Sequence, residues 1–181
     1  IKTRKKRFDI MLKAADFASS LNVPSITTHV GFVPEWPLSP QYEGIVKLIH
    51  QIATYCKNNE IDFCLETGQE TPITLLRLIN DVGLINLGVN FDPANLLLYG
   101  KGNPIDALDI LGPYIKGVHL KDGCYPTVGN KLGEEKALGQ GQVDFPLFIS
   151  RLLEIGYDGP LTLEIESVGV QQTKEAIIAI N

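Results

Sequence analysis

The chain has 181 residues, of which 44% are hydrophobic and 20% charged, the composition of an ordinary globular protein with enough residues for one sizeable core. Its formal net charge of −5 argues against a protein that mainly grips nucleic acid, because that affinity comes from clustered Lys and Arg. No segment approaches the roughly 20 consecutive apolar residues of a membrane span. We therefore expect neither a nucleic-acid partner nor a membrane partner.

The first residue, Ile1, already lies inside a helical pattern with no strand before it, as it would in a processed or truncated product. The basic run at 2–7 opens this helix, and we interpret it as a solvated first turn rather than a nucleic-acid arm. Cys56, Cys64 and Cys124 are an odd number with no metal-finger spacing, which favours reduced thiols in a cytoplasmic protein.

Residue periodicity predicts helices and strands in alternation. In chain order we expect a helix at 4–22, a strand at 24–30, a helix at 40–59, a strand at 61–66, a helix at 71–82, a strand at 86–92, a short helix near 104–112, a strand at 115–121, a long loop to about 143, a helix at 144–155, a strand at 160–166 and a last helix at 171–180. No linker divides these elements, so residues 1–181 are predicted to form a single domain. Strands separated by helices form parallel βαβ units, in either a doubly wound sheet or a (β/α) barrel.

Side-chain parity along the strands distinguishes these two folds, because successive residues point to opposite faces. In each predicted strand one face is aliphatic, whereas the other is small or polar and finishes with an ionisable group at the C-terminal end. A doubly wound sheet should be apolar on both faces, but a barrel gathers one face of every strand around a common axis. The pattern therefore favours the barrel. The ionisable residues at the strand ends are His29, Glu66, Asp92, His119 and Glu164.

Barrel enzymes carry their chemistry at the C-terminal ends of the strands, where these five side chains would converge. Three carboxylates in a confined site would raise one another's pKa, so a divalent cation is the simplest group that keeps them ionised together. Carboxylate oxygens with one imidazole nitrogen favour Mn²⁺, Mg²⁺ or Co²⁺ as the cofactor, and Zn²⁺ stays an alternative. Each residue alone could instead be a polar side chain satisfied by the backbone or a salt bridge, but a parity and strand end shared by all five favour a common site.

Six segments together resemble a known family. They are Thr28–Gly31, Leu65–Gly68, Asn90–Leu96, Val118–Asp122, Leu138–Phe145 and Leu163–Glu164. In order and strand position they are similar to the xylose isomerase-like TIM barrels, which include sugar-phosphate isomerases and epimerases, ketose 3-epimerases, inosose dehydratases and endonuclease IV-type DNA repair enzymes. The resemblance covers nearly the whole chain.

The resemblance implies a (β/α)8 TIM barrel in which the five strands of this chain are barrel strands 4 to 8. The three N-terminal βα units of such a barrel are lacking, and a complete barrel has about 250 residues. Five parallel strands alone would expose two strand edges and the inner wall of the sheet. We therefore expect either truncation of a larger protein or shielding by a partner subunit, as in a homo-oligomer.

The resemblance also implies that Glu66, Asp92, His119 and Glu164 are the ligands of a divalent metal ion. The expected activity is that of a metal-dependent isomerase or epimerase of a sugar or sugar phosphate, which moves a proton through an enediolate. Glu66 and Glu164 would be the catalytic residues, one as general base and the other as general acid from the opposite side. The alternatives are an inosose-type dehydratase and a non-catalytic sugar-binding barrel.

Four further residues are predicted to bind the small-molecule sugar, namely His29, Asn95, Lys121 and Trp36. Asn95 stands where many relatives have histidine, and it can hydrogen-bond a hydroxyl without binding metal comparably. For the other three, the alternatives are a packed histidine, a solvated lysine and an aromatic side chain that packs its own loop. Gly139-x-Gly141 could approach a phosphate with its backbone, but a tight turn before a helix cap at Asp144 is the favoured interpretation.

Overall fold

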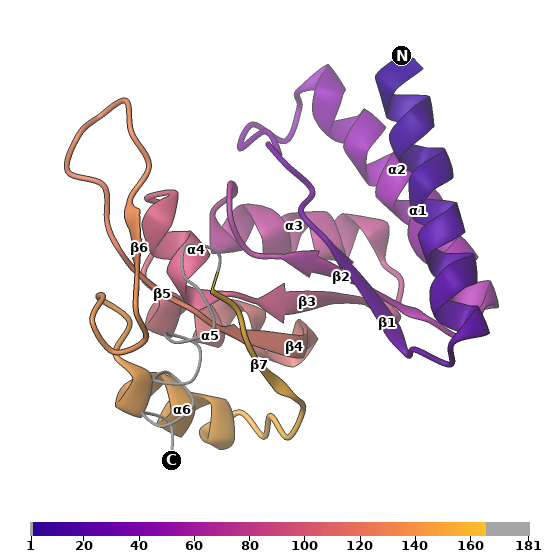
Figure 1. The fold of residues 1–181 in the computed structure, drawn as a ribbon. Helices are drawn as coiled ribbons and strands as arrows, with labels where there is room; N and C mark the ends of the chain where they lie inside the picture. The colour runs from indigo at the N-terminus through magenta and orange to yellow at the C-terminus, as the bar shows by residue number, and fades with distance from the viewer. Residues whose placement is uncertain (1, 166–181) are drawn as a thin grey trace.

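The computed structural model describes residues 2–165, and their side chains from residue 5 onward. Five parallel strands form one sheet in the order β1–β2–β3–β4–β7, flanked by helices as a half-barrel (Figure 1). The strands are β1 Ser25–Thr28, β2 Asp62–Glu66, β3 Leu87–Phe91, β4 Ile115–Leu120 and β7 Leu161–Leu163. The parallel sheet confirms the predicted α/β class, whereas the helix predicted at 171–180 lies outside the described residues.

The helices alternate with these strands, as the periodicity predicts. They are α1 Lys2–Ser20, α2 Pro40–Asn58, α3 Pro72–Val82, α4 Pro93–Leu98, α5 Pro104–Leu111 and α6 Phe145–Glu154, with a 3-10 turn at Gly112–Tyr114. Among residues 2–165, none of them is long and apolar enough to cross a membrane.

Helices α2 to α6 all begin with the same local signal, a capping side chain followed by proline in the first turn. The capping side chain accepts a hydrogen bond from a backbone N–H that has no partner within the helix, and proline is tolerated there because its missing N–H is not needed. The capping residues are Ser39, Thr71, Asp92, Asn103 and Asp144. The predicted cap at Asp144 is confirmed, since its Oδ1 accepts from Leu147 N at 3.1 Å.

The centre of the sheet is the most deeply buried part of the described chain. All five residues of β3 are buried, and Phe63 and Leu65 of β2 are fully inaccessible to solvent. These side chains belong to one hydrophobic cluster with Leu75 and Leu78 of α3. The aliphatic face of the strands therefore packs under the helices, which fixes the opposite, polar face as the inner wall of the half-barrel.

Helix α4 and the strands of a hairpin were not predicted from the sequence. Helix α4 follows β3 directly, although its Asp-Pro start at residues 92–93 is a readable cap signal. The long loop after β4 contains an antiparallel hairpin, β5 Asp122–Cys124 and β6 Glu134–Lys136. The hairpin is fixed by a tertiary contact as well as by its own pairing, since Gly133 N donates to Leu98 O at 2.8 Å. Only the assembled structure supplies that contact.

Strict alternation along the strands fails at one place, where the pairing of β3 with β4 shifts register between Val89 and Asn90. The shift lets Lys116 lie over Gly88, where an added Cβ would collide with the lysine side chain. From there Lys116 Nζ reaches Asp62 Oδ2 of β2 at 2.9 Å. The predicted inward positions of β4 beyond the shift are unaffected, because His119 pairs in register with Thr162 of β7.

Candidate metal centre

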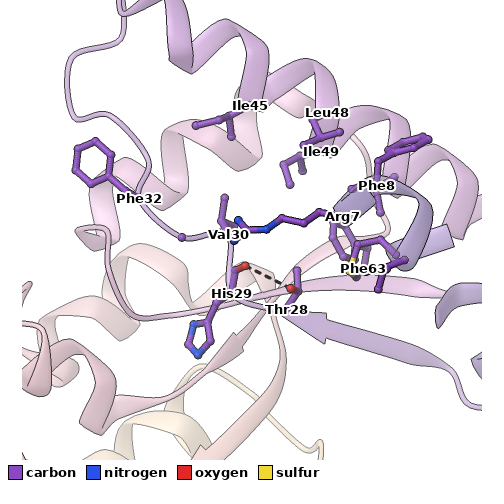
Figure 2. A pocket seen from close by; sticks show the side chains of 14 residues that line it. Arg7, Phe8, Thr28, His29, Val30, Phe32, Ile45, Leu48, Ile49 and Phe63 are labelled. Carbon is purple, nitrogen blue, oxygen red and sulfur yellow. Dashed lines mark hydrogen bonds between the residues drawn. The ribbon is translucent and has the colours of Figure 1, made fainter. Parts of the chain in front are cut away.

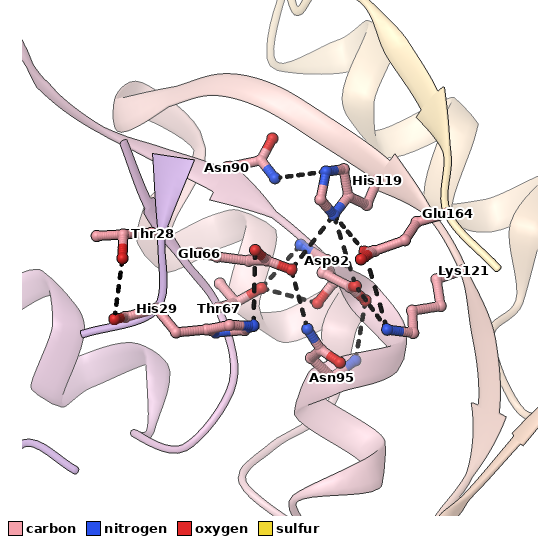
Figure 3. Close-up of polar contacts among 10 residues, drawn as sticks. All are labelled: Thr28, His29, Glu66, Thr67, Asn90, Asp92, Asn95, His119, Lys121 and Glu164. Atoms are coloured by element: carbon pink, nitrogen blue, oxygen red, sulfur yellow. Dashed lines mark hydrogen bonds and ion pairs between the residues drawn. The ribbon is translucent and has the colours of Figure 1, made fainter. Parts of the chain in front are cut away.

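Four side chains converge at the C-terminal end of the sheet (Figure 3). Glu66 ends β2, Asp92 follows β3 and caps α4, His119 lies in β4, and Glu164 follows β7. Each residue offers one ligand atom, and these atoms all lie within 4.8 Å of one another. The structure thus brings together the four residues that the sequence predicts as metal ligands.

His119 is the hub of this cluster. Its Nδ1 lies 2.6 Å from Glu164 Oε2, 3.3 Å from Glu66 Oε1 and 3.8 Å from Asp92 Oδ2. Burial disfavours the charged imidazole, but the carboxylates of Asp92 and Glu66 and the charge of Glu164 outweigh it and raise the pKa of His119 to about 10. The carboxylates therefore stabilise a positive charge at the position where their oxygens face one another.

The two glutamates respond differently to the same surroundings. Burial raises the pKa of Glu164, and the negative charges of Glu66 and Asp92 add to this effect beyond what His119 and Lys121 offset. Burial acts in the same direction on Glu66, but interactions with His119, His29 and Lys121 outweigh it and lower the pKa of that carboxyl. Glu66 is thus the more firmly ionised of the two.

The donor set fits a divalent cation. Among the described residues, Asp92 Oδ2, His119 Nδ1 and Glu164 Oε2 are buried polar atoms that make no well-aligned hydrogen bond, although each faces the others. Ligand atoms on opposite sides of a first-row divalent ion lie about 4.0 to 4.4 Å apart, given metal–ligand distances of about 2.0 to 2.2 Å. That separation is the largest possible between two ligands of one ion, and the four atoms, all within 4.8 Å of one another, need only small side-chain movements to fall within it.

The neighbours of the cluster hold its ligands in place. Thr67 Oγ1 donates to Asp92 O and accepts from Asp92 N, both at 2.8 Å, so it ties β2 to the end of β3. The Asn90 side-chain amide lies 2.9 Å from His119 Nε2. Neither residue was predicted from the sequence to belong to the site, although Thr67 follows a predicted ligand directly and Asn90 shares its parity with Asp92. Contacts of this kind orient metal ligands in many sites.

Three of the four predicted substrate-binding residues touch the cluster. Asn95 is buried and donates from Nδ2 to Glu66 Oε1 at 3.2 Å. Lys121 is 2% exposed, and its Nζ lies 3.9 Å from Asp92 Oδ2 and 3.8 Å from Glu164 Oε2. A buried ammonium group between two carboxylates is not the solvated lysine of the alternative interpretation.

His29 lies at the edge of the cluster, with Nε2 3.6 Å from Glu66 Oε2 and a side chain that is 47% exposed. Its backbone lines an apolar groove of about 720 Å³ between β1, α1 and α2, while Figure 2 shows its ring pointing away from the apolar side chains there. His29 is therefore not the packed histidine of the alternative interpretation.

Trp36 is not brought to the cluster by any contact among the described residues. It is 68% exposed in the loop between β1 and α2. Arg77 of α3 holds this loop, because its guanidinium donates to Pro34 O at 2.8 Å and to Glu35 O at 3.0 Å. A role for Trp36 in binding sugar stays a prediction.

The family model described as a xylose isomerase-like TIM barrel matches residues 2–180. The chain belongs to this family. The match confirms the resemblance drawn from the strand-end motifs, and it agrees with the half-barrel observed here.

The similar proteins are longer than this chain. YihM, an uncharacterized protein of Escherichia coli, is 27% identical over 187 residues, which cover 94% of this chain and 55% of that protein. The crystal structure of a xylose isomerase domain protein from Planctomyces limnophilus is 42% identical, with a TM-score of 0.93, and the match covers 99% of this chain and 64% of that one. The chain thus spans between half and two thirds of these relatives.

More distant solved structures show the fold alone. A xylose isomerase-like TIM barrel protein from Mycobacterium smegmatis, in complex with magnesium, is 19% identical with a TM-score of 0.77 over 99% of this chain and 67% of that one. D-psicose 3-epimerase from Clostridium cellulolyticum H10, with D-tagatose, is 19% identical with a TM-score of 0.70 over 94% and 60%. AsbF of Bacillus anthracis, a probable 3-DHS dehydratase, is 20% identical with a TM-score of 0.76 over 98% and 70%. An epimerase and a probable dehydratase thus have the same fold as this chain.

Proposed function

We propose that the protein containing this chain is a metal-dependent isomerase or epimerase of a sugar or sugar phosphate, and that the four-residue cluster is its active site. The observation that carries the proposal is the convergence of Glu66, Asp92, His119 and Glu164 at the C-terminal end of the sheet, with ligand atoms within 4.8 Å of one another. Catalytic groups of TIM barrels lie at this end. The epimerase among the similar structures supports the same reaction class.

The proposed metal ligands are the four residues of the cluster, with Mn²⁺, Mg²⁺ or Co²⁺ favoured and Zn²⁺ an alternative. A bound divalent cation would polarise a sugar carbonyl and stabilise the negative charge that develops on its oxygen. If the Asn90 amide turns its oxygen to His119 Nε2–H, the lone pair of Nδ1 is directed at the carboxylates, as a ligand requires.

Glu66 and Glu164 are the proposed proton carriers. They approach the hub from different strands, because Glu66 ends β2 and Glu164 follows β7 on the far side of β3 and β4. A carbon between them would meet one carboxylate on each face, so that one group removes the proton and the other returns it with inversion. Return to the neighbouring carbon would give isomerisation instead. Lys121 and His29 would then bind substrate oxygens at the two flanks of the cluster.

A dehydratase is the second candidate, favoured by the similarity to AsbF, a probable 3-DHS dehydratase. The same proton removal would precede loss of a β-hydroxyl group as water. The non-catalytic sugar-binding barrel is less well supported, because binding alone does not require two carboxylates on opposite sides of one point. Product analysis separates the first two candidates, since only the dehydratase gives a product lighter by one water.

The half-barrel itself needs a covering, and we propose that further βα units of the same protein or a partner subunit supply it. Among the described residues β1 pairs only with β2, which leaves one edge of β1 unpaired. Apolar side chains beside this edge are exposed, including Phe17 at 66% and Phe32 at 67%. Proteins usually cover such edges and patches.

The experiment that tests the proposal is deuterium wash-in from D₂O into a panel of ketoses and aldoses, with the full-length protein loaded in turn with Mn²⁺, Mg²⁺, Co²⁺ and Zn²⁺. We expect deuterium at a carbon next to the sugar carbonyl, and a loss of about 10²- to 10⁴-fold in Glu164→Gln because a positioned proton carrier is removed. Glu43→Gln is the matched control, since Glu43 is exposed on α2 and pairs with the exposed Lys47. Exchange that survives unchanged in Glu164→Gln would refute the assignment.

A further inference from the structure

Tyr99, the residue that ends α4, has a hydroxyl group with no hydrogen-bond partner among the described residues. The chain has six tyrosines, and all six lie in the part that the structure describes. In the other five, the hydroxyl donates a hydrogen bond to an oxygen of the chain; they are Tyr42, Tyr55, Tyr114, Tyr125 and Tyr157. The fold therefore satisfies its phenol groups internally, and Tyr99 departs from that pattern.

The backbone around Tyr99 is nevertheless held from both sides. Tyr99 N donates to Asn95 O at 3.0 Å, which closes the last turn of α4. Gly100 then ends the helix in the left-handed region, at φ 64°, and its N–H donates to Leu97 O at 2.9 Å. Tyr125 Oη donates to Gly100 O at 2.9 Å. The position of Tyr99 is thus fixed without any contribution from its own hydroxyl.

The ring of Tyr99 lies near the β1 edge of the metal cluster. A Cβ added at Gly68 would lie 3.3 Å from His29 Nδ1 and 3.6 Å from Tyr99 Cε2, so both rings occupy the side of Gly68 where a side chain would stand. The other ring nitrogen of His29, Nε2, lies 3.6 Å from Glu66 Oε2 (Figure 3). The side chain of Tyr99 is partly exposed, and its ring is accordingly open to a ligand at this edge.

A phenol of this kind is suited to bind a sugar hydroxyl. Its O–H can donate one hydrogen bond and its oxygen can accept another, which matches the two capacities of an alcohol. Because the backbone is already fixed, little conformational freedom is lost when a ligand binds. A site that hydrogen-bonds a substrate hydroxyl also discriminates against the analogue that lacks it.

We propose that Tyr99 is a further substrate-binding residue of the same site, whose hydroxyl hydrogen-bonds a sugar hydroxyl away from the reacting carbon, on the β1 side. The inference rests on the proposed function, because the sugar has to bind at the four-residue cluster. The ligand class that Tyr99 selects is a sugar with a hydroxyl group at this place, in preference to the deoxy sugar. Tyr99 binds and does not carry the proton, because no contact joins it to His119 among the described residues.

The first test compares two proteins and two kinds of sugar in the wash-in assay, with metal-loaded full-length protein. Tyr99→Phe removes the hydroxyl alone, and a ketose that exchanges is compared with its monodeoxy analogues. With the parent ketose, kcat/KM should fall about 3- to 10-fold in Tyr99→Phe, mainly through KM, because one neutral hydrogen bond is lost from substrate and transition state alike. With one monodeoxy analogue the two proteins should be equal, because the partner hydroxyl is already absent.

Tyr114→Phe is the matched control. Tyr114 directly precedes β4, at the opposite end of the sheet from the cluster, and its hydroxyl donates to Asn80 at 3.0 Å. Equal kcat/KM of Tyr99→Phe and the wild-type protein with the parent ketose would overturn the inference. The same loss with every monodeoxy analogue would overturn it as well, because the hydroxyl would then act on the protein and not on the sugar.

The second test needs no turnover and uses NMR of the tyrosine rings, labelled with ¹³C, in the full-length protein loaded with Mg²⁺. The Tyr99 resonance is assigned by its loss in Tyr99→Phe, and the sugars of the panel are then added. We expect the Tyr99 resonance to shift while that of Tyr114 does not. Exchange without a shift of Tyr99 would overturn the inference and leave the proposed function intact. A shift without exchange would support the inference and contradict the proposed function, and the absence of both would refute both.

Discussion

Polar side chains at the strand ends are more deeply buried at the centre of the sheet than at its β1 edge. At the centre, β3 is wholly buried, and Asp92, which follows it, is inaccessible to solvent. Thr67 Oγ1 donates to the backbone oxygen of Asp92, and the Asp92 carboxylate accepts from Asn95 N. At the edge, β1 has no fully buried residue. His29, which follows β1 as Asp92 follows β3, has a half-exposed ring and contacts the cluster through Glu66. Neighbours on both sides, more than residue type, set how firmly a strand-end side chain is fixed.

This difference predicts that substitutions after the buried central strands have large effects and those at the β1 edge small ones. A buried polar group that loses its partner is costly because water cannot replace that partner. At an exposed position water replaces the lost contact. The expected effects therefore fall from the buried centre of the sheet to the β1 edge.

The largest effect is expected at Asp92. Asp92→Asn should lower the affinity for divalent metal by more than about 100-fold, because the substitution removes the charge of a ligand, whereas changes in groups that merely orient ligands cost about 10- to 100-fold. The amide oxygen can still accept from Asn95 N, so the cap of α4 should survive. Titration calorimetry with Mn²⁺ measures the affinity. Asp144→Asn makes the same change at another cap and should leave metal affinity unaltered.

Glu70 should make stability depend on pH. It is 3% exposed, and burial raises the pKa of its carboxyl to about 7 against an ordinary value of 4.5. Between these values the unfolded chain has lost the proton that the folded protein keeps, so the free energy of unfolding falls as pH rises through this window, by roughly 1.4 kcal/mol per unit of pKa difference.

Glu70→Gln should remove this fall, because glutamine has no proton to lose. Urea unfolding of the variant at pH 5 and pH 8 measures the difference, with Glu43→Gln as the exposed control. An unchanged pH slope in Glu70→Gln would show that another group is responsible.

Gly141→Ala should destabilise the loop after β4 by about 1 to 3 kcal/mol, the usual cost of forcing extra atoms into a packed site. Its new methyl group would overlap the Asp122 carboxylate. It would thereby weaken the hydrogen bonds that this carboxylate accepts from the backbone N–H groups of Gly123, Gly139, Gly141 and Val143. Gly129→Ala in the hairpin loop is the control, since nothing lies within 4 Å of the added Cβ. Chemical denaturation measures both, and equal stability of the two variants would contradict the close packing of Gly141 against the Asp122 carboxylate.

The smallest effect is expected at the edge. His29→Ala should lower kcat/KM for exchange by less than about tenfold, because a half-exposed side chain with one contact at 3.6 Å contributes no more than about 1 kcal/mol. Metal affinity should be unchanged. His50→Ala on the exposed face of α2 is the control. A loss of kcat/KM in His29→Ala as large as that in Glu164→Gln would show that the residue after β1 takes part in the reaction itself.

Most of the fold and the candidate ligands could be predicted from the sequence alone. Strand periodicity identified every strand of the parallel sheet, and parity identified which residues share the inner face, because both depend on local geometry that repeats every two residues. The helix starts were also readable as caps followed by proline. Even α4, which was missed, had that signal at Asp92-Pro93.

Only the tertiary structure decided how these residues are used. The register shift between β3 and β4 places Lys116 over Gly88, and no local pattern reveals it because it depends on the partner strand. The pairing of β5 with β6 and the hydrogen bonds from Gly139 N and Gly141 N to Asp122 Oδ2 likewise join residues that are not neighbours in the sequence. The sequence determined which polar groups lie at the strand ends, and packing determined which became a shared cluster, which stayed at the edge and which closed a loop, because burial and partners exist only in the folded chain.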